Sequence, residues 1–404
     1  MKVKINKGTA KGYIDAPPSK SMAHRMLICA GISAGTCLVH GISESEDILA
    51  TMDCLKTLGA QFQKQGDSIR VQGCDLKSVA SNEILKCRES GSTLRFFVPI
   101  CLLAGKELQL TGSERLLERP LGVYQELCDE KGMNFVHNDN GISVCGPLKA
   151  GTYKMAGNVS SQFISGLLFA LPLLGEDSRL EIVPPIESRP YIDMTLSALE
   201  TFGVKVYWEG DNTLIIPGRQ TYYTDEVTVE GDYSNAAFLE ALNIFGGEVE
   251  VGNLTADSLQ GDKVYGDMFR ELQRGCAELD ISNCPDLGPI LFAVSAAMKG
   301  GKFTGTERLK IKESDRATVM AEELKKFGVN VIVGDDFVTV EPSEFAAPME
   351  ELYGHNDHRI VMSMAVLATI TGGTISGAQA VNKSFPDFFE KISSLGIEVN
   401  ILED

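Results

Sequence analysis

Residues 160–183 read SSQFISGLLFALPLLGEDSRLEIV, a phrase with a polar start, an apolar helix-like run, a glycine and a short strand-like tail. The phrase recurs along the chain. Its six copies are 71, 70, 72, 54 and 71 residues apart and begin at Ser19, Ser90, Ser160, Asp232, Asp286 and Asp357. A fixed period of this kind predicts a repeated architecture in which neighbouring units share a core.

A second phrase keeps the same period. In it a helix ends at a glycine and alternating strand residues come next, as in LETFGVKVYWEGDNTLIIPG at residues 199–218. The six glycines are Gly59, Gly132, Gly203, Gly275, Gly328 and Gly396. Glycine at this place is typical of a helix end in the left-handed conformation. Each unit is therefore predicted to run helix, strand, helix and then one or more strands.

The predicted fold class is α/β. One unit cannot cover both faces of its own sheet, so three neighbouring units are expected to pack around a shared core. Six units predict two pseudo-symmetric halves, with the boundary near residues 230–232. The short fourth spacing predicts that the second half contains a trimmed unit.

The charge balance restricts the partners. The chain has 55 acidic and 37 basic residues and a formal net charge of −18. Such a surface repels nucleic acid and anionic membranes. We therefore expect no nucleic-acid or membrane partner, and any anionic ligand should be small and bound in a local basic pocket.

The expected location is the cytoplasm. The first 15 residues, MKVKINKGTAKGYID, lack the apolar stretch of a secretory signal, and the longest apolar region, residues 164–174, is too short to span a bilayer. Ten cysteines without a C-x-x-C pair predict reduced thiols in the core.

The six phrase starts are candidate anion sites. Each begins with Ser or Asp, which can cap a helix, and a helix N-terminus attracts phosphate or carboxylate. Cations or further hydroxyls follow several of them: Lys20, Ser21 and Arg25; Gly91, Ser92 and Arg95; Ser161 and Gln162; His358 and Arg359. We expect the starts of each half to converge, and the two sets to face one cleft. A purely structural capping role for Ser160, Ser161 and Asp286 stays open, as does an ion-pair role for Arg95.

The run KIKESDR at residues 310–316 places both charge signs in the fifth unit. Such runs are usually solvated. Here the run comes after the strand of a unit that also carries Asp286. Arg316 could clamp a carboxylate or phosphate, Lys312 could add a point charge, and Glu313 could move a proton. The alternative is that Arg25 and Arg316 form surface salt bridges of little energetic value.

Together these stretches resemble one family, the 5-enolpyruvylshikimate-3-phosphate synthases (3-phosphoshikimate 1-carboxyvinyltransferases), which are enolpyruvyltransferases. The resemblance covers nearly the whole chain. Its motifs, in order, are SKSMAHR at 19–25, LLERP at 116–120, NVSSQF at 158–163, SRPYID at 188–193, NCPDL at 283–287, KIKESDR at 310–316, NDHR at 356–359 and NKSFPDF at 382–388.

The resemblance implies a two-domain inside-out α/β barrel with six βαβαββ-type repeats, three in each domain. It places the first domain at 19–230 and the second at 1–18 plus 231–404. A two-stranded hinge is expected near 16–18 and 229–232.

The resemblance also implies an activity, the transfer of the enolpyruvyl group of phosphoenolpyruvate to the 5-hydroxyl of shikimate 3-phosphate. The products are 5-enolpyruvylshikimate 3-phosphate and phosphate, in the shikimate pathway to chorismate and aromatic amino acids. No metal or organic cofactor is expected. The partners would be the two small anionic substrates, and we expect a monomer.

The implied site residues fall into three sets. The candidates for acid and base catalysis, with their roles undivided, are Lys20, Asp286 and Glu313. The implied ligands of shikimate 3-phosphate are Lys20, Ser21, Arg25, Ser160, Ser161, Gln162, Ser188, Tyr191, Asp286 and Lys312. The implied ligands of phosphoenolpyruvate are Lys20, Gly91, Arg119, Gln162, Arg316, Arg359 and Lys383.

One motif departs from the family, and two rival functions stay open. Where the family often has Asn-Ala-Gly-Thr-Ala, residues 89–93 are Glu-Ser-Gly-Ser-Thr, which keep the glycine. UDP-N-acetylglucosamine enolpyruvyltransferases carry a cysteine in a glycine-rich loop after an arginine-proline pair, whereas Cys128 lies in a helical pattern. A non-catalytic anion-binding relative is the other alternative. His355 and His358 lack further residues for a metal site.

Overall fold

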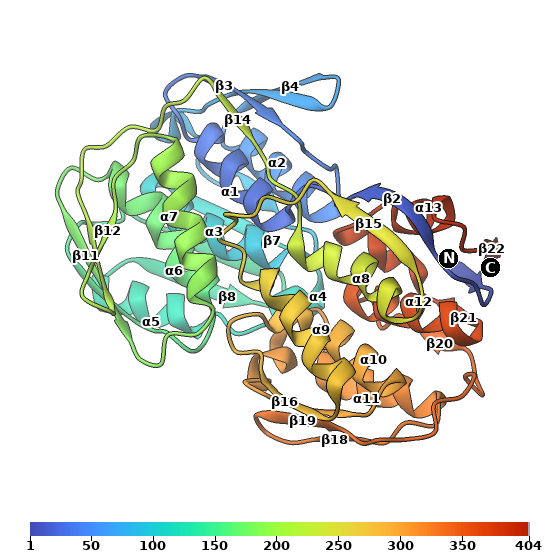
Figure 1. Cartoon of the computed structure of the whole chain (residues 1–404). Helices are drawn as coiled ribbons and strands as arrows, with labels where there is room; N and C mark the ends of the chain where they lie inside the picture. Colours follow the sequence, from blue (N-terminus) through green and yellow to red (C-terminus); the bar gives the residue numbers. More distant parts are fainter. Residues whose placement is uncertain (403–404) are drawn as a thin grey trace. The chain divides into compact units, whose positions relative to one another are not determined.

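A computed structural model describes residues 1–402 and divides the chain into two compact units (Figure 1). The continuous unit is Pro18–Glu230, and the split unit combines Met1–Pro17 with Gly231–Asp404. The chain passes between them twice. At these passages the amide of Ser19 donates to the carbonyl of Glu230 at 2.7 Å, and the amide of Asp232 donates to the carbonyl of Pro17 at 2.8 Å.

Within residues 1–402, five of six sheets share one pattern of four strands, in which the first two are parallel and the other neighbours antiparallel. The continuous unit has the sheets β14 (Glu226–Thr228), β3 (Thr36–His40), β5 (Ser68–Gln72), β4 (Gln61–Gln65); β6 (Ile84–Lys86), β7 (Glu107–Thr111), β9 (Gly141–Cys145), β8 (Asn134–Asn138); and β10 (Thr152–Ala156), β11 (Ser178–Val183), β13 (Thr213–Ile216), β12 (Tyr207–Glu209). The split unit has β16 (Ala277–Asp280), β17 (Gly301–Thr304), β19 (Phe337–Val340), β18 (Val331–Val333); and β20 (Leu352–Tyr353), β21 (Gly373–Ser376), β1 (Lys2–Ile5), β22 (Val399–Leu402).

The sixth sheet belongs to the trimmed unit. It consists of the parallel pair β2 (Lys11–Asp15) and β15 (Glu248–Gly252), without a hairpin beside it. The missing hairpin accounts for the spacing of 54 residues and confirms the prediction of a trimmed unit. It also makes the predicted left-handed conformation wrong for one of the six glycines. Gly275 ends its helix at φ 166, in extended backbone, because the chain runs directly into β16. The other five helix-ending glycines have φ between +67° and +107°.

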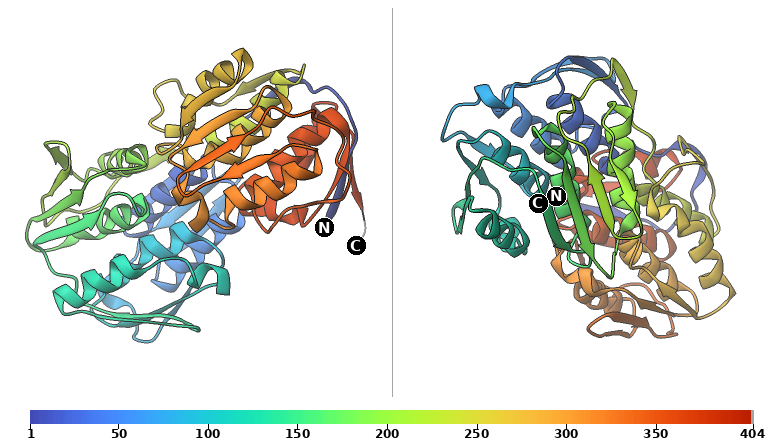
Figure 2. Two further views of the ribbon diagram at one scale, coloured as in Figure 1. Left: turned by 90° about the horizontal axis from the view of Figure 1, so that it is seen from below. Right: turned by 90° about the vertical axis from the view of Figure 1, so that its left-hand side faces the viewer.

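In the continuous unit, helices fill the interior, and the sheets and other helices lie around them (Figure 2). Three helices, α1 (Lys20–Gly31), α3 (Gly91–Leu103) and α6 (Ser161–Ala170), are buried along almost their whole length. Helices α3 and α6 are apolar nearly all round, whereas α1 also buries His24 and Arg25. The remaining helices of this unit are α2 (Glu46–Thr57), α4 (Glu114–Leu117), α5 (Gly122–Lys131) and α7 (Arg189–Thr201), with the short turns η1 (Leu76–Ser78) and η2 (Leu171–Leu173).

The split unit repeats this plan around its own core. Its buried helices are α8 (Tyr233–Ile244), α10 (Gly288–Ala297) and α12 (His358–Thr371). The others are α9 (Tyr265–Arg274), α11 (Arg316–Lys326) and α13 (Phe388–Ser394), with the turns η3 (Gly261–Val264), η4 (Pro285–Leu287), η5 (Glu307–Ile311) and η6 (Ala378–Lys383). Each unit thus has its own hydrophobic core, as the repeat predicted.

Two other expectations concern membranes and thiols. Among the described residues, no helix has the length and apolarity needed to cross a membrane. All ten cysteines are free. Seven are buried and two are half-buried, whereas Cys276 is exposed beside the start of β16, so the prediction of core thiols is wrong for this one residue.

Candidate active site

The starts of α3 and α6 meet at Gln162 in the continuous unit. The Gln162 side chain accepts a hydrogen bond from Nη1 of Arg95 at 2.7 Å and donates to Oγ of Ser92 at 2.9 Å. Its backbone amide donates to Oγ of Ser160, which caps α6. Ser161 is the first residue of that helix. Arg95 is buried, and its contact with Gln162 holds the orientation of this amide.

Gly91 opens α3 directly against Arg119. A Cβ atom at position 91 would lie 2.5 Å from Nη1 of Arg119, closer than van der Waals contact allows. Arg119 is 7% exposed and comes shortly after α4. Glycine at this position therefore lets a guanidinium approach the N-terminus of α3, where an anion would find N–H donors and a positive side chain together.

Helix α1 contributes two cations. Nζ of Lys20 lies 2.8 Å from a carboxylate oxygen of Asp47 in α2. Arg25 donates from Nε to Oγ1 of Thr195 and from Nη2 to the carbonyl of Tyr191, each at 2.8 Å. Burial lowers the pKa of Arg25 to about 10. At 3% exposure Arg25 is no surface salt bridge, which excludes the alternative considered for it.

Two further predicted residues lie near these contacts. The carbonyl of Ser21 accepts from Nη1 of Arg25 at 2.6 Å. Ser188 precedes α7 in the left-handed conformation, with φ 53, and is buried. A non-glycine residue in this conformation is held there by its surroundings, and such residues are frequent at functional sites. Tyr191 lies in the first turn of the same helix.

Asp286 is the centre of the polar cluster in the split unit. One of its oxygens accepts from Nζ of Lys312 at 3.1 Å and from Nη1 of Arg316 at 2.9 Å. The other oxygen accepts from Nη2 of Arg359 at 2.9 Å. The expectation that Asp286 caps α10 is wrong, because the residue lies in η4 and the cap position is Leu287. Its carboxylate bonds to three cations instead.

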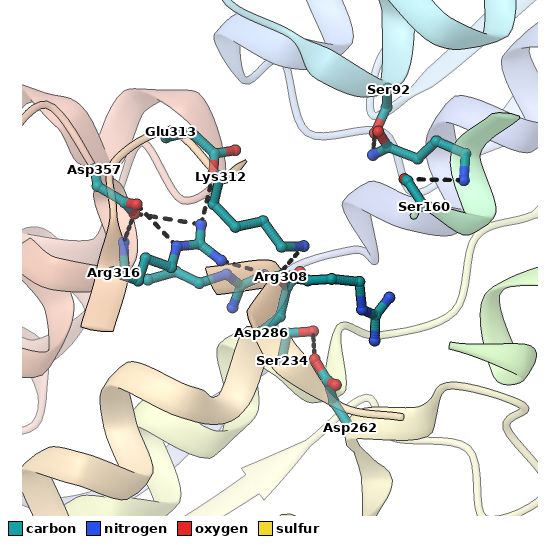
Figure 3. Close-up of polar contacts among 12 residues, drawn as sticks. Ser92, Ser160, Ser234, Asp262, Asp286, Arg308, Lys312, Glu313, Arg316 and Asp357 are labelled. Carbon is teal, nitrogen blue, oxygen red and sulfur yellow. Dashed lines mark hydrogen bonds and ion pairs between the residues drawn. The ribbon is translucent and has the colours of Figure 1, made fainter. Parts of the chain in front are cut away.

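Arg316 connects three carboxylates. Its Nε donates to Asp357 at 2.8 Å, its Nη1 to Asp286, and its Nη2 to Glu313 at 2.8 Å (Figure 3). Burial alone would lower the pKa of Arg316, but the negative charges of Asp357, Glu313 and Asp286 raise it. With 1% of its side chain exposed, Arg316 is not a surface salt bridge. The KIKESDR run thus needs both charge signs because it folds into a buried ion cluster.

Lys312 and Lys383 complete the cations of this unit. Burial lowers the pKa of Lys312, although Asp286 opposes that effect. Nζ of Lys383, at the end of η6, donates to the carbonyl of Asn356 at 2.5 Å. Asn356 precedes Asp357 and has φ 51. Each of the predicted cations of this unit thus has a defined contact. Arg316 and Arg359 contact Asp286, and Lys383 contacts Asn356, next to the cap of α12.

A buried carboxyl beside this cluster was not predicted from the sequence. Asp262, in η3, is 1% exposed, and the hydroxyl of Ser234 donates to one of its oxygens (Figure 3). Its other oxygen has no hydrogen-bond partner among the described residues. Burial, followed by the charge of Asp286, raises the pKa of Asp262 to about 7. Both effects favour the neutral, protonated form of the Asp262 carboxyl over its ionised form.

The sequence signals for the missed residues differ. Asp357 stands inside the NDHR motif and could have been assigned as a partner of Arg316, because a buried guanidinium needs a carboxylate. Asp47 lies in an ordinary amphipathic helix, and Asp262 comes after a glycine in a loop, so neither carries a local signal. Residues 1–402 contain no group of three or more His, Cys, Asp or Glu side chains that could hold a metal ion.

The polar contacts of the continuous unit and those of the split unit have complementary chemistry. The continuous unit offers helix N-termini, hydroxyls and guanidinium groups, which bind phosphate and carboxylate oxygens. The split unit offers three arginine or lysine side chains around carboxylates that can accept or release protons. Such residues can bind small anions and transfer protons to or from them.

Comparisons with known proteins name one family. The family model described as EPSP synthase (3-phosphoshikimate 1-carboxyvinyltransferase) matches residues 5–392. Two curated relatives carry the name 3-phosphoshikimate 1-carboxyvinyltransferase. The relative from Clostridium perfringens is 38% identical, with 98% of both chains aligned. The relative from Clostridium beijerinckii is 37% identical, with 98% of this chain and 97% of the relative aligned.

Solved structures agree on the fold. An EPSP synthase from Acinetobacter baumannii has a TM-score of 0.76 at 24% identity, and the match covers 99% of this chain and 100% of that one. The enolpyruvyl transferase NikO from Streptomyces tendae has a TM-score of 0.80 at 14% identity, covering 99% and 98%. These likenesses confirm the inside-out α/β fold class.

Proposed function

The chain belongs to the EPSP synthase family, and we propose that it transfers the enolpyruvyl group of phosphoenolpyruvate to the 5-hydroxyl of shikimate 3-phosphate, releasing phosphate. The observation that supports this most strongly is the carboxylate of Asp286, bonded to Lys312, Arg316 and Arg359. A proton acceptor surrounded by cations suits a reaction between two anions in which a hydroxyl must lose its proton.

The split unit would hold the phosphoenolpyruvate carboxylate and phosphate through Arg316, Arg359 and Lys383. Arg316 uses four of its five N–H donors on Asp357, Asp286 and Glu313. The fifth donor, on Nη1, has no acceptor among residues 1–402 and is assigned to the substrate. Lys312 and Asp286 are assigned to shikimate 3-phosphate.

The continuous unit would bind both substrates. For shikimate 3-phosphate we assign Ser21, Arg25, Ser160, Ser161, Ser188 and Tyr191. For phosphoenolpyruvate we assign Gly91 and Arg119, and Lys20 and Gln162 are assigned to both substrates. The supporting observation is that Gln162 links the starts of α3 and α6. Its side-chain amide donates to Ser92, next to Gly91, and its backbone amide donates to Ser160, the cap of α6.

The reaction needs one base and one acid. As the 5-oxygen bonds to C2 of phosphoenolpyruvate, a base takes the hydroxyl proton and an acid protonates the methylene carbon C3. The tetrahedral intermediate then loses phosphate as C3 gives up a proton and the double bond forms again. We assign these proton transfers to Lys20, Asp286 and Glu313. Glu313 lies 2.8 Å from Arg316, and a cation at this distance favours the ionised carboxylate, so its acid role would require relief of that contact.

The two chain passages, near residues 16–18 and 229–232, are proposed as a hinge. Its support is the pair of backbone hydrogen bonds that join Ser19 to Glu230 and Asp232 to Pro17. If the hinge closes on substrate, small-angle scattering should show a smaller radius of gyration after shikimate 3-phosphate is added. An unchanged radius would overturn the hinge assignment.

The expected partners are two small anions, and we propose that the enzyme is a cytoplasmic monomer. Ten free thiols are typical of a reducing compartment, and the net charge of −18 disfavours nucleic acid. Light scattering during size-exclusion chromatography tests the monomer.

The deciding experiment is phosphate release from phosphoenolpyruvate with each acceptor in turn. Release with shikimate 3-phosphate supports the proposal. Release with UDP-N-acetylglucosamine alone would instead favour the rival enolpyruvyltransferase. Binding of shikimate 3-phosphate by calorimetry without any phosphate release would favour a non-catalytic anion-binding relative.

A further inference from the structure

Four buried polar side chains link three helices of the continuous unit. Nδ1 of His24 in α1 lies 2.7 Å from Oγ1 of Thr51 in α2. Oγ1 of Thr51 lies 2.8 Å from Oγ1 of Thr93 in α3, which donates to Oγ of Ser90 at 2.8 Å. All four side chains are at most 1% exposed. Buried polar groups destabilise the fold unless each has a hydrogen-bond partner, so this series of hydrogen bonds fixes the relative positions of the three helices.

The number of hydroxyl protons fixes the donor and the acceptor in each of these hydrogen bonds. A hydroxyl has one proton, and that of Thr93 goes to Ser90. Thr51 must therefore donate to Thr93, and Nδ1–H of His24 must donate to Thr51. Nε2 of His24 then carries a lone pair, and it has no hydrogen-bond partner among the described residues. Burial, with the nearby Lys20 and Arg25, lowers the pKa of His24 well below its usual value, so the imidazole is neutral.

This series of hydrogen bonds ends at Ser90, in the turn that holds Gly91. Ser90 caps α3 by accepting the backbone N–H of Thr93 at 3.2 Å. The next residue, Gly91, is the one whose Cβ would lie 2.5 Å from the Arg119 guanidinium. Since the guanidinium lies this close to Gly91, a shift in the first turn of α3 changes the distance between its N–H donors and Arg119.

We propose that His24 and Thr51 are positioning residues that act through Thr93 and Ser90 to hold the first turn of α3 in place for phosphoenolpyruvate. The assignment rests on the proposed function, because it takes Gly91 and Arg119 as part of the phosphoenolpyruvate subsite. Neither His24 nor Thr51 touches the substrate. Their effect should therefore appear in the affinity for phosphoenolpyruvate and leave the affinity for shikimate 3-phosphate unchanged.

The first variant is Thr51→Val, which keeps the side-chain shape and removes the hydroxyl between His24 and Thr93. The matched control is Thr57→Val in the same helix, whose hydroxyl only donates to the carbonyl of Asp53. Steady-state phosphate release should show a KM for phosphoenolpyruvate raised about five- to thirty-fold in Thr51→Val, the range expected when a buried donor loses its acceptor. The KM for shikimate 3-phosphate and kcat should stay within about two-fold of the wild type.

A second pair of variants keeps the test decisive if Thr51→Val does not fold. His24→Asn retains an N–H donor near the Nδ1 position and should keep most of the wild-type affinity for phosphoenolpyruvate. His24→Leu has no such donor and should lose this affinity. An unchanged KM for phosphoenolpyruvate in folded Thr51→Val, or equal effects of Asn and Leu at position 24, would overturn the positioning role. Absence of turnover in the wild type would instead overturn the proposed function.

Discussion

Arg316 and Asp357 form a buried ion pair that joins the starts of two helices. Nε of Arg316 donates to one carboxylate oxygen at 2.8 Å, and Nη2 lies 3.4 Å from the other. The side chains are 1% and 0% exposed. Asp357 also caps α12 by accepting the amide of Arg359 at 2.9 Å. One carboxylate thus positions α11 and α12 together, and with them two of the predicted substrate cations.

This arrangement predicts a large stability loss for Arg316→Met. The substitution removes one partner of a buried pair and leaves Asp357 without its compensating charge, which costs about 3–5 kcal/mol. Urea unfolding measures the loss. Arg274→Met, at an exposed end of α9, is the control and should stay within about 0.5 kcal/mol of the wild type. Equal stability of the two variants would show that Asp357 does not depend on Arg316.

Asp286→Asn should lose turnover while keeping substrate binding. Asparagine has one acceptor oxygen where the carboxylate bonds to three cations, and it cannot take a proton. We expect kcat to fall on the order of 10²- to 10⁴-fold, as for a lost general base. Calorimetry should still detect shikimate 3-phosphate, and Glu313→Ala should behave in the same way. Asp280→Asn on β16 is the control, and unchanged rates in both site variants would exclude their assigned roles.

The fold was predictable from the sequence to a large extent, because it depends on periodic patterns. Two phrases repeated six times indicated the units, and the 54-residue spacing indicated the one that lacks a hairpin. The extended Gly275 was not predictable, since its conformation depends on the direct entry of the chain into β16 rather than on the glycine itself.

The candidate site was predictable only where its residues lie in motifs. Arg316 and Asp286 could be named from KIKESDR and NCPDL. The bond between them could not, because 30 residues separate them and the hydrogen bond is made in the folded unit. Asp262 and Thr51 were missed since burial, and not residue type or spacing, gives them their character.

Gly91→Ala should weaken phosphoenolpyruvate binding with little loss of stability. The added Cβ would lie 2.5 Å from a nitrogen of Arg119, the far end of a flexible side chain that can move away. Moving it separates the guanidinium from the start of α3. The KM for phosphoenolpyruvate should rise about ten-fold, equivalent to about 1.4 kcal/mol, while the melting temperature stays near that of the wild type. Gly122→Ala, with open space around its Cβ, serves as the control.

The free energy of unfolding of Asp262→Asn relative to the wild type should increase as the pH rises. Burial, followed by Asp286, raises the pKa of Asp262 to about 7, above its unfolded value of 3.8. Folding is therefore opposed increasingly as the pH climbs from about 4 through 7, because ionisation is easier in the unfolded chain. Asparagine does not ionise, so the stability of the variant relative to the wild type should increase between pH 5 and pH 8. An exposed Asp257→Asn control should show no such trend.

Glu323 holds the segment that leads to Asp357, and its loss should reach the candidate site. Its oxygens accept from Nζ of Lys326 and the amide of Tyr353, and they lie 2.9 Å from Nε2 of His355. Burial raises the pKa of Glu323, but these hydrogen bonds outweigh it and lower the pKa overall. The stabilisation is therefore present above about pH 4.5 and is lost as the pH falls through the lowered value.

Glu323→Gln should thus destabilise the protein by about 1.5–3 kcal/mol at pH 7, the usual value of a hydrogen bond to a charged group. The difference should shrink as the pH falls from about 4.5 through the lowered pKa, because the wild-type carboxylate then also becomes neutral. His355 and Asn356 have φ of 47 and 51, so this turn needs support from its surroundings, and the carbonyl of Asn356 accepts from Lys383. We therefore expect a raised KM for phosphoenolpyruvate as well. The exposed neighbour Glu322→Gln is the control, and equal urea midpoints for the two variants would show that Glu323 does not support the turn.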